Sequence, residues 1–339
     1  METGHRGKQS FVFHNTPSIL SYASVAGKKE SQGPLSAAFD CTSQDNSFGQ
    51  KSWEKAESEM QKTAVRLALQ KGGLRAEELD AAFAGDLLNQ CIGSSFSMRN
   101  SRVPTFGLYG ACSTMAEALL LAGVSVDGGY CRRALALTSS HFASSERQYR
   151  FPLGYGGQRT PTAQWTVTGA GAVILGAQGS GPYLRGGTVG TIIDAGIKDA
   201  NNMGAAMAPA AFDTLRRHFD DHSLSPEDYD LIVTGDLGQL GSRIVRDLFE
   251  REGVRLGERY RDCGVMIFDL KRQDVHCGGS GCGCSASVLC GYLLGQMQRR
   301  AVNRLLFCGT GALLSPLSTQ QGESIPAVCH AVSISTERN

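Results

Sequence analysis

The segment Tyr109-Gly110-Ala111-Cys112-Ser113-Thr114 carries the strongest indication of the fold class. It follows an apolar segment, residues 103–108, and an apolar helical pattern of Met115, Ala116 and Leu119 begins directly after it. A strand, a tight turn and a helix in this order predict an exposed Cys112 at a helix N-terminus. The free N–H groups and the dipole of such a helix end favour a thiolate, so we expect a lowered pKa for Cys112. The alternative is a buried structural cysteine.

Two parts of the chain repeat in the same order, which indicates an internal duplication. A helical pattern, a strand pattern and a Gly-Asp-Leu triplet occur twice: 53–71, 81–84 and Gly85-Asp86-Leu87, then 209–221, 230–234 and Gly235-Asp236-Leu237. The segment after Cys112-Ser113 is matched in the same way by the segment after Cys284-Ser285. Helices that alternate with short apolar strands are typical of layered α/β proteins. We therefore predict two similar halves, residues 1–178 and 179–339.

Composition excludes several classes of function. The 339 residues carry 33 basic and 32 acidic side chains, so no basic excess points to a nucleic-acid surface. No apolar stretch is long enough to span a membrane, and the N-terminus lacks the apolar region of a secretory signal. An odd count of eleven cysteines in such a chain indicates free thiols. Cys277, Cys282 and Cys284 lack paired metal-ligand spacing, so we expect no metal there.

A second group of candidates follows the strand pattern that starts near residue 134. His141 comes at its end, in Thr138-Ser139-Ser140-His141, where a side chain can point into a cleft or serve only the structure. The polar, aromatic and glycine-rich residues 144–158 predict a long ordered loop. In that loop Arg147 and Arg150 can clamp a carboxylate, or anchor the loop by pairing with acidic residues.

Two glycine-rich segments occur in the second half. Gly278-Gly279-Ser280-Gly281-Cys282-Gly283-Cys284-Ser285 precedes an apolar helical pattern, so its N–H groups can bind an anion or its glycines can serve close packing. Residues 309–315 read as a similar loop after a strand at 305–308.

Two halves, a cysteine at a helix start and glycine-rich loops in the second half together resemble the thiolase and ketoacyl-synthase superfamily. This resemblance implies an α/β fold, a five-layered α-β-α-β-α sandwich of two duplicated halves, which is usually dimeric. It places Cys112 at the position of the acyl-accepting nucleophile. The second half lacks the Gly-His-Pro-type motif of catalytic thiolases, and only Cys308 is available for their second cysteine. The resemblance therefore favours a binding pocket derived from an enzyme.

The chain is similar to the stage V sporulation protein AD family of endospore-forming bacteria over residues 8–335. The segments that carry the likeness are 84–90, 109–114, 136–141, 146–150, 207–211 and 310–316. The resemblance implies binding of dipicolinic acid (pyridine-2,6-dicarboxylate), as its calcium chelate, for uptake into the developing spore and release in germination. It also implies membrane proteins of the SpoVA complex as partners, a peripheral place at the spore inner membrane, and a homodimer.

We expect the ligand to be bound by residues near the motif positions, without a cofactor or a protein-bound metal. The expected ligand-binding residues are Cys112, Ser139, Ser140, His141, Arg147, Gly279 and Ser280. The alternative is a cysteine-dependent acyltransferase or ketoacyl-synthase-like enzyme in which Cys112 is the nucleophile. A third possibility is a scaffold whose pocket holds no ligand.

Overall fold

The structure is a computed structural model that describes residues 4–149 and 159–338. Arg150 and the rest of 150–158, which we predicted as part of a long loop, lie outside the described residues. Thirteen of the described strands form one large mixed sheet, because β10 (Tyr183–Thr188) of the second half pairs with β3 (Ser18–Ala26) of the first through Tyr183 and Ser18. A separate two-stranded parallel sheet joins β8 (Trp165–Thr166) to β13 (Gly279–Ser280).

The first half contains five main strands in the order β6-β5-β7-β9-β3. β5 is parallel to β6 and β7, and β9 is antiparallel to β7 and β3. The elements of this half are β1 (His5–Arg6), β2 (Ser10–Val12), β3 (Ser18–Ala26), β4 (Cys41–Thr42), α1 (Trp53–Gly72), β5 (Ala81–Gly85), α2 (Ile92–Met98), β6 (Thr105–Leu108), α3 (Thr114–Asp127), β7 (Arg133–Ser140), α4 (Phe142–Tyr149) and β9 (Gly169–Gly176).

The second half repeats this arrangement in the order β12-β11-β14-β15-β10. β11 is parallel to β12 and β14, and β15 is antiparallel to β14 and β10. Its elements are β10 (Tyr183–Thr188), α5 (Met203–His222), β11 (Leu231–Thr234), α6 (Gly238–Arg251), β12 (Tyr260–Asp262), α7 (Cys263–Met266), α8 (Cys282–Val288), α9 (Leu294–Gln298), β14 (Arg304–Ala312), α10 (Pro316–Gln320) and β15 (Ala327–Ser335). The matching strand orders and directions show the duplicated thiolase-like architecture, whereas the boundary between residues 178 and 179 remains a prediction.

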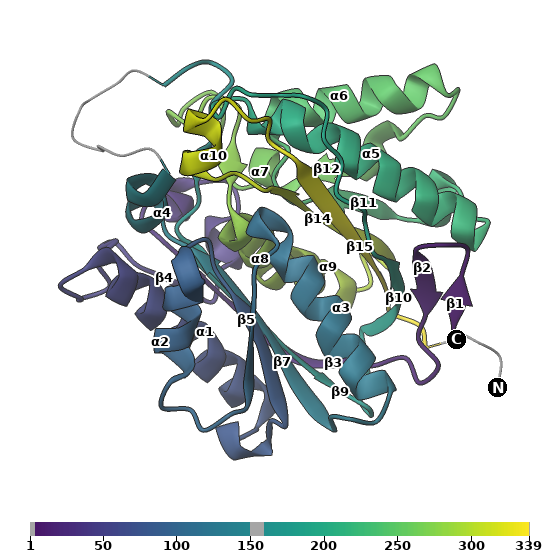
Figure 1. Cartoon of the computed structure of the whole chain (residues 1–339). Coiled ribbons are helices and arrows are strands. Elements are labelled where there is room, and N and C mark those ends of the chain that lie inside the picture. Colours follow the sequence, from purple (N-terminus) through teal and green to yellow (C-terminus); the bar gives the residue numbers. More distant parts are fainter. Residues whose placement is uncertain (1–3, 150–158, 339) are drawn as a thin grey trace.

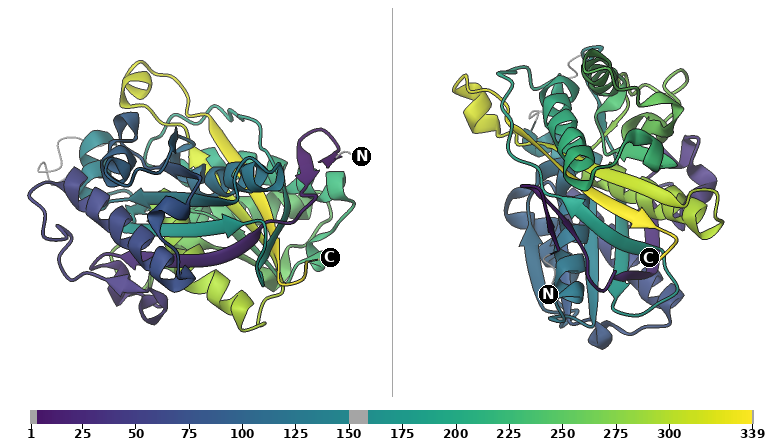
Figure 2. Two further views of the ribbon diagram at one scale, coloured as in Figure 1. Left: turned by 90° about the horizontal axis from the view of Figure 1, so that it is seen from below. Right: turned by 90° about the vertical axis from the view of Figure 1, so that its right-hand side faces the viewer.

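The layers follow from which helices are buried on both sides. α3 and α8 contact strands of both halves and form the central helical layer, while α1 and α5 cover the outer faces (Figures 1 and 2). Met115, Ala116 and Leu119 of α3 are fully buried, as expected for a helix that packs against strands of both halves. The turn at the start of α3, which contains Cys112, is therefore held between the two halves.

The sequence also predicts Ser52 as the N-cap of the first helix, Gly72-Gly73 as its end, and Ser225 as the N-cap of a short helix with Pro226 at its first position, and the cap geometry confirms them. Ser52 accepts a hydrogen bond from the backbone N–H of Lys55 at 3.4 Å and begins α1. Gly73 ends α1 in a left-handed conformation with a φ of 61°. Ser225 and Asp228 form the predicted capping box around Pro226.

Three predicted boundaries are wrong. The helix predicted over 209–221 begins at Met203, because Asn202 caps it, and Pro209 lies inside it. The predicted loop at 309–315 is strand up to Ala312, because β14 remains paired with β15 to that point. The described start of the predicted loop at 144–158 is helical in α4, where Ser144 and Ser145 are buried against the rest of the protein.

None of the helices in the described ranges is both long and apolar enough to cross a membrane.

Candidate functional site around Cys112

Cys112 lies in a single 3-10 turn, Ala111–Ser113, that connects the edge strand β6 to α3. Ala111 has a φ of 50°, a left-handed conformation that is strained for a residue with a side chain. Two hydroxyls hold the turn: Ser113 Oγ donates to the Gly110 carbonyl at 2.7 Å, and Thr114 Oγ1 donates to the Ala111 carbonyl at 2.6 Å. The predicted strand, turn and helix are confirmed, but Cys112 is only 6% exposed.

Two glycines of β14 allow the turn to lie directly on the second half. A Cβ on Gly311 would lie 2.3 Å from the Gly110 carbonyl oxygen, and a Cβ on Gly309 would lie 2.8 Å from the Ser113 carbonyl oxygen. Both carbonyl oxygens belong to the backbone, so they have little freedom to move away from an added Cβ. These glycines, which we read as part of a loop, are required by the close approach of β14 to the Cys112 turn.

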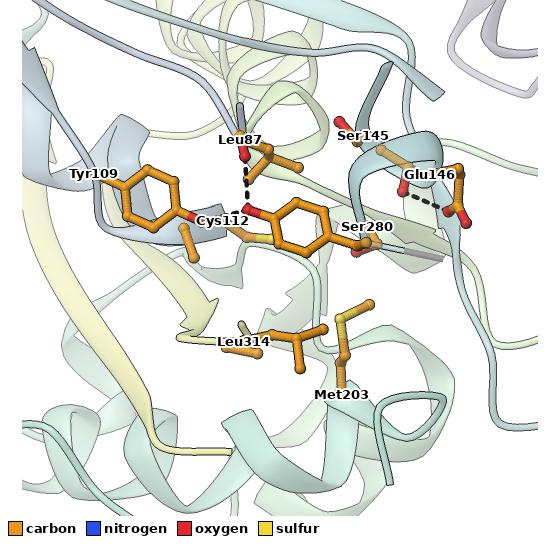
Figure 3. A pocket seen from close by; sticks show the side chains of 12 residues that line it. Leu87, Tyr109, Cys112, Ser145, Glu146, Met203, Ser280 and Leu314 are labelled. Carbon is orange, nitrogen blue, oxygen red and sulfur yellow. Dashed lines mark hydrogen bonds between the residues drawn. The ribbon is translucent and has the colours of Figure 1, made fainter. Parts of the chain in front are cut away.

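A small cavity of about 40 Å³ lies beside Cys112, where both halves meet. It is found at the carboxyl ends of β5, β6, β7 and β14, a common place for sites in α/β proteins. In Figure 3, Cys112 lies between Tyr109 and Ser280, with Leu314 and Met203 on one side and Leu87 on the other. The lining residues are Leu87, Tyr109, Ala111, Cys112, Ser145, Glu146, Tyr149, Thr166, Met203, Ser280, Ala312 and Leu314.

Two tyrosines close one side of this cavity. The hydroxyls of Tyr109 and Tyr149 are 2.5 Å apart, and the Tyr149 hydroxyl donates to the Leu87 carbonyl at 2.7 Å. Both rings are held by hydrogen bonds at their polar ends, so their faces remain available as apolar walls. Thr166 Oγ1 donates to Glu146 Oε1 at 2.9 Å on the opposite side.

The group that contacts the thiol is a carboxyl, Asp236, at the end of β11. Its side chain is fully buried and lies close enough to the Cys112 thiol to raise the pKa of that thiol. It also accepts hydrogen bonds from Thr310 Oγ1 and from the Gly281 N–H, both at 2.8 Å. Burial raises the pKa of Asp236 to about 6. The thiol therefore faces a buried acid whose other contacts are neutral, rather than a histidine.

The predicted lowering of the Cys112 pKa is wrong. Burial raises the pKa of the Cys112 thiol well above its ordinary value, and Asp236 and Cys282 raise it further. The Gly281 N–H lowers the pKa of the thiol, but its effect is smaller than the effects that raise it. Desolvation and a neighbouring carboxyl outweigh the helix dipole here, so the thiol is protonated at neutral pH.

Asp236 is one of several buried carboxyls in the described residues. Burial raises the pKa of Asp262 to about 7 and that of Glu30, which accepts a hydrogen bond from the Thr168 N–H at 3.0 Å, also to about 7. Each of these acids binds its proton more tightly in the folded than in the unfolded protein. The stability that each contributes is complete at acid pH and is lost as pH rises through the folded pKa.

Glu30→Gln tests this linkage, because glutamine keeps an acceptor for the Thr168 N–H without a titratable group. As pH rises from about 4 to about 8, we expect the free energy of unfolding of the variant relative to wild type to shift in the variant's favour by about 3 kcal/mol. Denaturant unfolding at a series of pH values measures this difference. A difference that stays constant with pH would contradict the raised pKa of Glu30.

The structure brings only two of the seven expected ligand-binding residues, Cys112 and Ser280, to the cavity wall. Ser139 Oγ donates to Glu57 Oε1 at 2.8 Å, on the side of β7 that faces α1. Ser140 Oγ donates to the Val167 carbonyl at 2.7 Å. Gly279 accepts at its carbonyl from Gln164 Nε2 at 2.7 Å. The predicted ligand contacts of these three residues stay predictions, and in the structure each of them makes internal hydrogen bonds.

His141 and Arg147 are likewise engaged with the protein itself. His141 Nε2 lies 2.7 Å from the Asn46 carbonyl, and its ring stacks on Trp53 with centroids 5.5 Å apart. Arg147 forms an ion pair with Glu54 of α1. Of the two readings of Arg147 from sequence, this contact matches the one in which it anchors its segment to an acidic residue.

The glycine-rich segment before α8 uses its N–H groups inside the protein. The Gly281 N–H donates to Asp236, and the Gly283 N–H donates to Ser140 Oγ at 3.1 Å. A Cβ on Gly283 would lie 2.4 Å from the Gly169 carbonyl oxygen, so close packing explains the glycine. The thiols of Cys277, Cys282 and Cys284 each contact a different backbone carbonyl, and Cys308 is buried in β14 outside the cavity lining.

The sequence interpretation missed Asp236, Tyr109, Tyr149 and Leu314 as site residues. Asp236 was noticed only as part of a repeated triplet, although an acid at the end of a buried strand is itself a signal of a site. The tyrosines were quoted within motifs but not assigned to a wall. Their convergence depends on the packing of the two halves, which local patterns do not reveal.

Comparison with known proteins finds a family that matches nearly the whole chain. The chain matches the family described as Stage V sporulation protein AD (SpoVAD) over residues 7–335. It is 45% identical over 326 residues to stage V sporulation protein AD of Bacillus subtilis (strain 168), which covers 96% of both chains.

Solved structures of ketosynthases share the fold. 3-oxoacyl-[acyl-carrier-protein] synthase III from Aquifex aeolicus VF5 is 13% identical, with a TM-score of 0.57 over 94% of this chain and 99% of that one. Cerulenin-bound OleA from Xanthomonas campestris is 15% identical, with a TM-score of 0.61 over 96% of this chain and 97% of that one. At this identity the likeness shows the thiolase-like fold alone. The match over nearly the whole chain and the 45% identity show that the protein belongs to the stage V sporulation protein AD family.

Proposed function

We propose that this sporulation protein binds dipicolinate, as its calcium chelate, in the Cys112 cavity, and supports its uptake into the developing spore and its release in germination. The observation that carries the proposal is the contact between Cys112 and Asp236. A thiol that is kept protonated by burial, and further by a neighbouring carboxyl, is a poor nucleophile. The site is therefore enclosed like that of an enzyme but lacks an activated nucleophile.

The cavity walls suit a flat aromatic ring with polar substituents. Tyr109 and Tyr149 present aromatic faces, and Leu87 and Leu314 add aliphatic surface. Ser280 supplies a hydroxyl at the edge of the lining. Mostly apolar walls with a few placed polar groups are characteristic of small-molecule sites.

The charges near the cavity favour the chelate over the free dianion. Among residues 4–149 and 159–338, the cavity lining contains no lysine or arginine, and Asp236 lies directly behind Cys112. A dianion placed there would meet a carboxyl without a compensating cation, which is costly in a buried site. Calcium that enters with the ligand cancels its two negative charges.

The ligand must widen the cavity to enter. A volume of about 40 Å³ holds about three water molecules, which is less than a pyridine ring with two carboxylates requires. The hydroxyl contact between Tyr109 and Tyr149 is the hydrogen bond that has to break for the rings to separate. We therefore expect binding to be slower than diffusion, because the two rings must separate before the ligand enters.

Calorimetric titration with dipicolinate, with and without calcium, tests this proposal on wild type and Cys112→Ala. We expect saturable binding by both proteins, tighter with calcium, since the thiol contributes shape rather than charge. Absence of binding to wild type would contradict the proposal and favour the alternative function, an acyltransferase that depends on Cys112. In that case acylation of Cys112 by an acyl-CoA is the activity to measure.

We also propose that the protein acts at the spore inner membrane through membrane proteins of the SpoVA complex, and that it forms a homodimer. The edge strand β6 supports pairing of two copies, because it ends the sheet and its Phe106 is 59% exposed. Size-exclusion chromatography with light scattering of wild type and Phe106→Asp tests the dimer.

A further inference from the structure

A second, larger cavity of about 570 Å³ lies at the other end of the second half. Arg304, the first residue of β14, lines this cavity. Ala312, the last residue of the same strand, lines the Cys112 cavity. The two cavities share no lining residue. The second cavity is lined by Arg6, Val12, Phe13, Arg185, Gly186, His218, His222, Leu224, Tyr229, Arg304, Ser333, Ile334, Ser335 and Glu337. It lies where the end of α5 meets the β1–β2 hairpin (Figure 1).

A bulge in β10 directs Arg185 into this cavity. β10 pairs with β15 through Leu184 and Ile334 and then through Gly186 and Ser333, so Arg185 is the extra residue between the two pairs. Bulges commonly re-aim a side chain and are frequent beside functional sites. Arg304 pairs with Ser335 on the other side of β15 and lines the same cavity. Two arginines from the strands on either side of β15 are thus brought to one concave surface.

Within residues 4–149 and 159–338, the side chain of Arg185 forms no ion pair. Its Nη1 atom is buried and has no hydrogen-bond partner among the described residues. Burial and the nearby Arg304 both lower the pKa of Arg185, which means that its charge is poorly compensated. A buried donor without an acceptor and two neighbouring cations are both unfavourable, and a bound anion relieves both.

Further donors surround the two arginines. His222 Nε2 is also buried without a partner among the described residues. The floor of the cavity is an ordered polar chain, in which His218 Nε2 lies 2.7 Å from the Tyr229 hydroxyl, and that hydroxyl donates to Ser333 Oγ at 3.3 Å. The acidic groups near the cavity are Glu337 at its exposed side, Asp228, which lies 3.8 Å from Arg304, and Asp221, which accepts a hydrogen bond from Ser10 Oγ and acts on His222.

We infer that this cavity is a binding site for a small oxyanion with at least two negative charges, held by Arg185 and Arg304. The planar guanidinium groups can each give two parallel hydrogen bonds to the oxygens of a carboxylate or a phosphate. Carboxylate and phosphate ligands share this chemistry. The site is independent of the proposed function at Cys112, because it uses other residues at the opposite ends of the strands.

Titration calorimetry with two probes, inorganic phosphate and dipicolinate without calcium, tests the site in a buffer free of other multivalent anions. On wild type, Arg185→Gln and Arg304→Gln we expect saturable binding of at least one probe that weakens about tenfold or more in each variant. Arg75→Gln is the matched control, because its side chain is 80% exposed in the first half. The probe that binds identifies whether the ligand is a phosphate or a dicarboxylate.

Leu314→Trp separates this site from the first one, because it fills the Cys112 cavity and should leave binding at the arginines unchanged. If Arg185→Gln fails to fold, Arg185→Lys keeps the charge but removes the two-pronged contact and should still weaken binding. The melting temperature should rise with the anion in wild type and not in Arg185→Gln. No saturable binding of either probe to wild type, or equal affinity in wild type and both arginine variants, would overturn the inference.

Discussion

Asp236→Asn is expected to speed the alkylation of Cys112 by iodoacetamide about tenfold or more at neutral pH. Burial remains the largest cause of the raised thiol pKa, but the variant removes the carboxyl that ranks next. A neighbouring like charge shifts a pKa by about one to three units, and the thiolate fraction rises about tenfold for each unit. Asparagine preserves the size and one acceptor, so the thiol should stay in place. Mass spectrometry of the Cys112 peptide over time measures the rate.

Asp86→Asn is the matched control for this experiment. Asp86 occupies the equivalent triplet of the first half and is equally buried, but its carboxyl accepts from Ser94 and Leu88 and is not among the groups that shift the Cys112 pKa. The rate should therefore stay near that of wild type. Equal rates in wild type and Asp236→Asn would mean that Asp236 does not control the thiol, and the argument against nucleophilic chemistry would fail.

Gly311→Ala is expected to destabilise the protein by about 3 kcal/mol or more, and to abolish ligand binding in whatever fraction remains folded. The new Cβ would lie 2.3 Å from the Gly110 carbonyl oxygen and 3.3 Å from the Cys112 backbone nitrogen. Neither backbone atom can move without displacing the Cys112 turn from β14. Denaturant unfolding followed by circular dichroism measures the loss.

Gly107→Ala is the control, because Gly107 also lies in a strand but has space for an added Cβ. Gly107 lies in the edge strand β6, and the nearest atom to a Cβ there is 4.0 Å away on Cys91. We expect a change within about 1 kcal/mol, and a stabilising one if the strand geometry suits alanine. Equal effects at Gly311 and Gly107 would show that the contact between the halves is looser than described.

The sequence was sufficient to predict the elements that depend on local chemistry. The caps at Ser52, Gly73 and Ser225 are confirmed because each is a short-range hydrogen-bonding pattern. The strand, turn and helix around Cys112 are confirmed for the same reason. Where Pro209 and Gly309 looked like breaks, however, long-range packing kept the helix and the strand continuous.

The electrostatics of the site could not be predicted from local sequence. The Cys112 pKa depends on burial between two halves and on Asp236, which lies far along the chain at the end of β11. A helix N-terminus taken alone predicts the opposite direction. His141 and Arg147 look like ligand-binding residues in sequence, and only the structure shows Asn46 and Glu54 as their partners.

Titration of wild type and Leu314→Trp with calcium dipicolinate tests whether the ligand binds beside Cys112. Leu314 lines the Cys112 cavity and is only partly buried, so tryptophan there fills the cavity without entering the core. Leu317→Trp is the control, because Leu317 is 65% exposed and outside the lining. We predict saturable binding to wild type and Leu317→Trp, and none to Leu314→Trp at an unchanged melting temperature. Equal binding by all three proteins, or no binding to wild type, would contradict a ligand site beside Cys112.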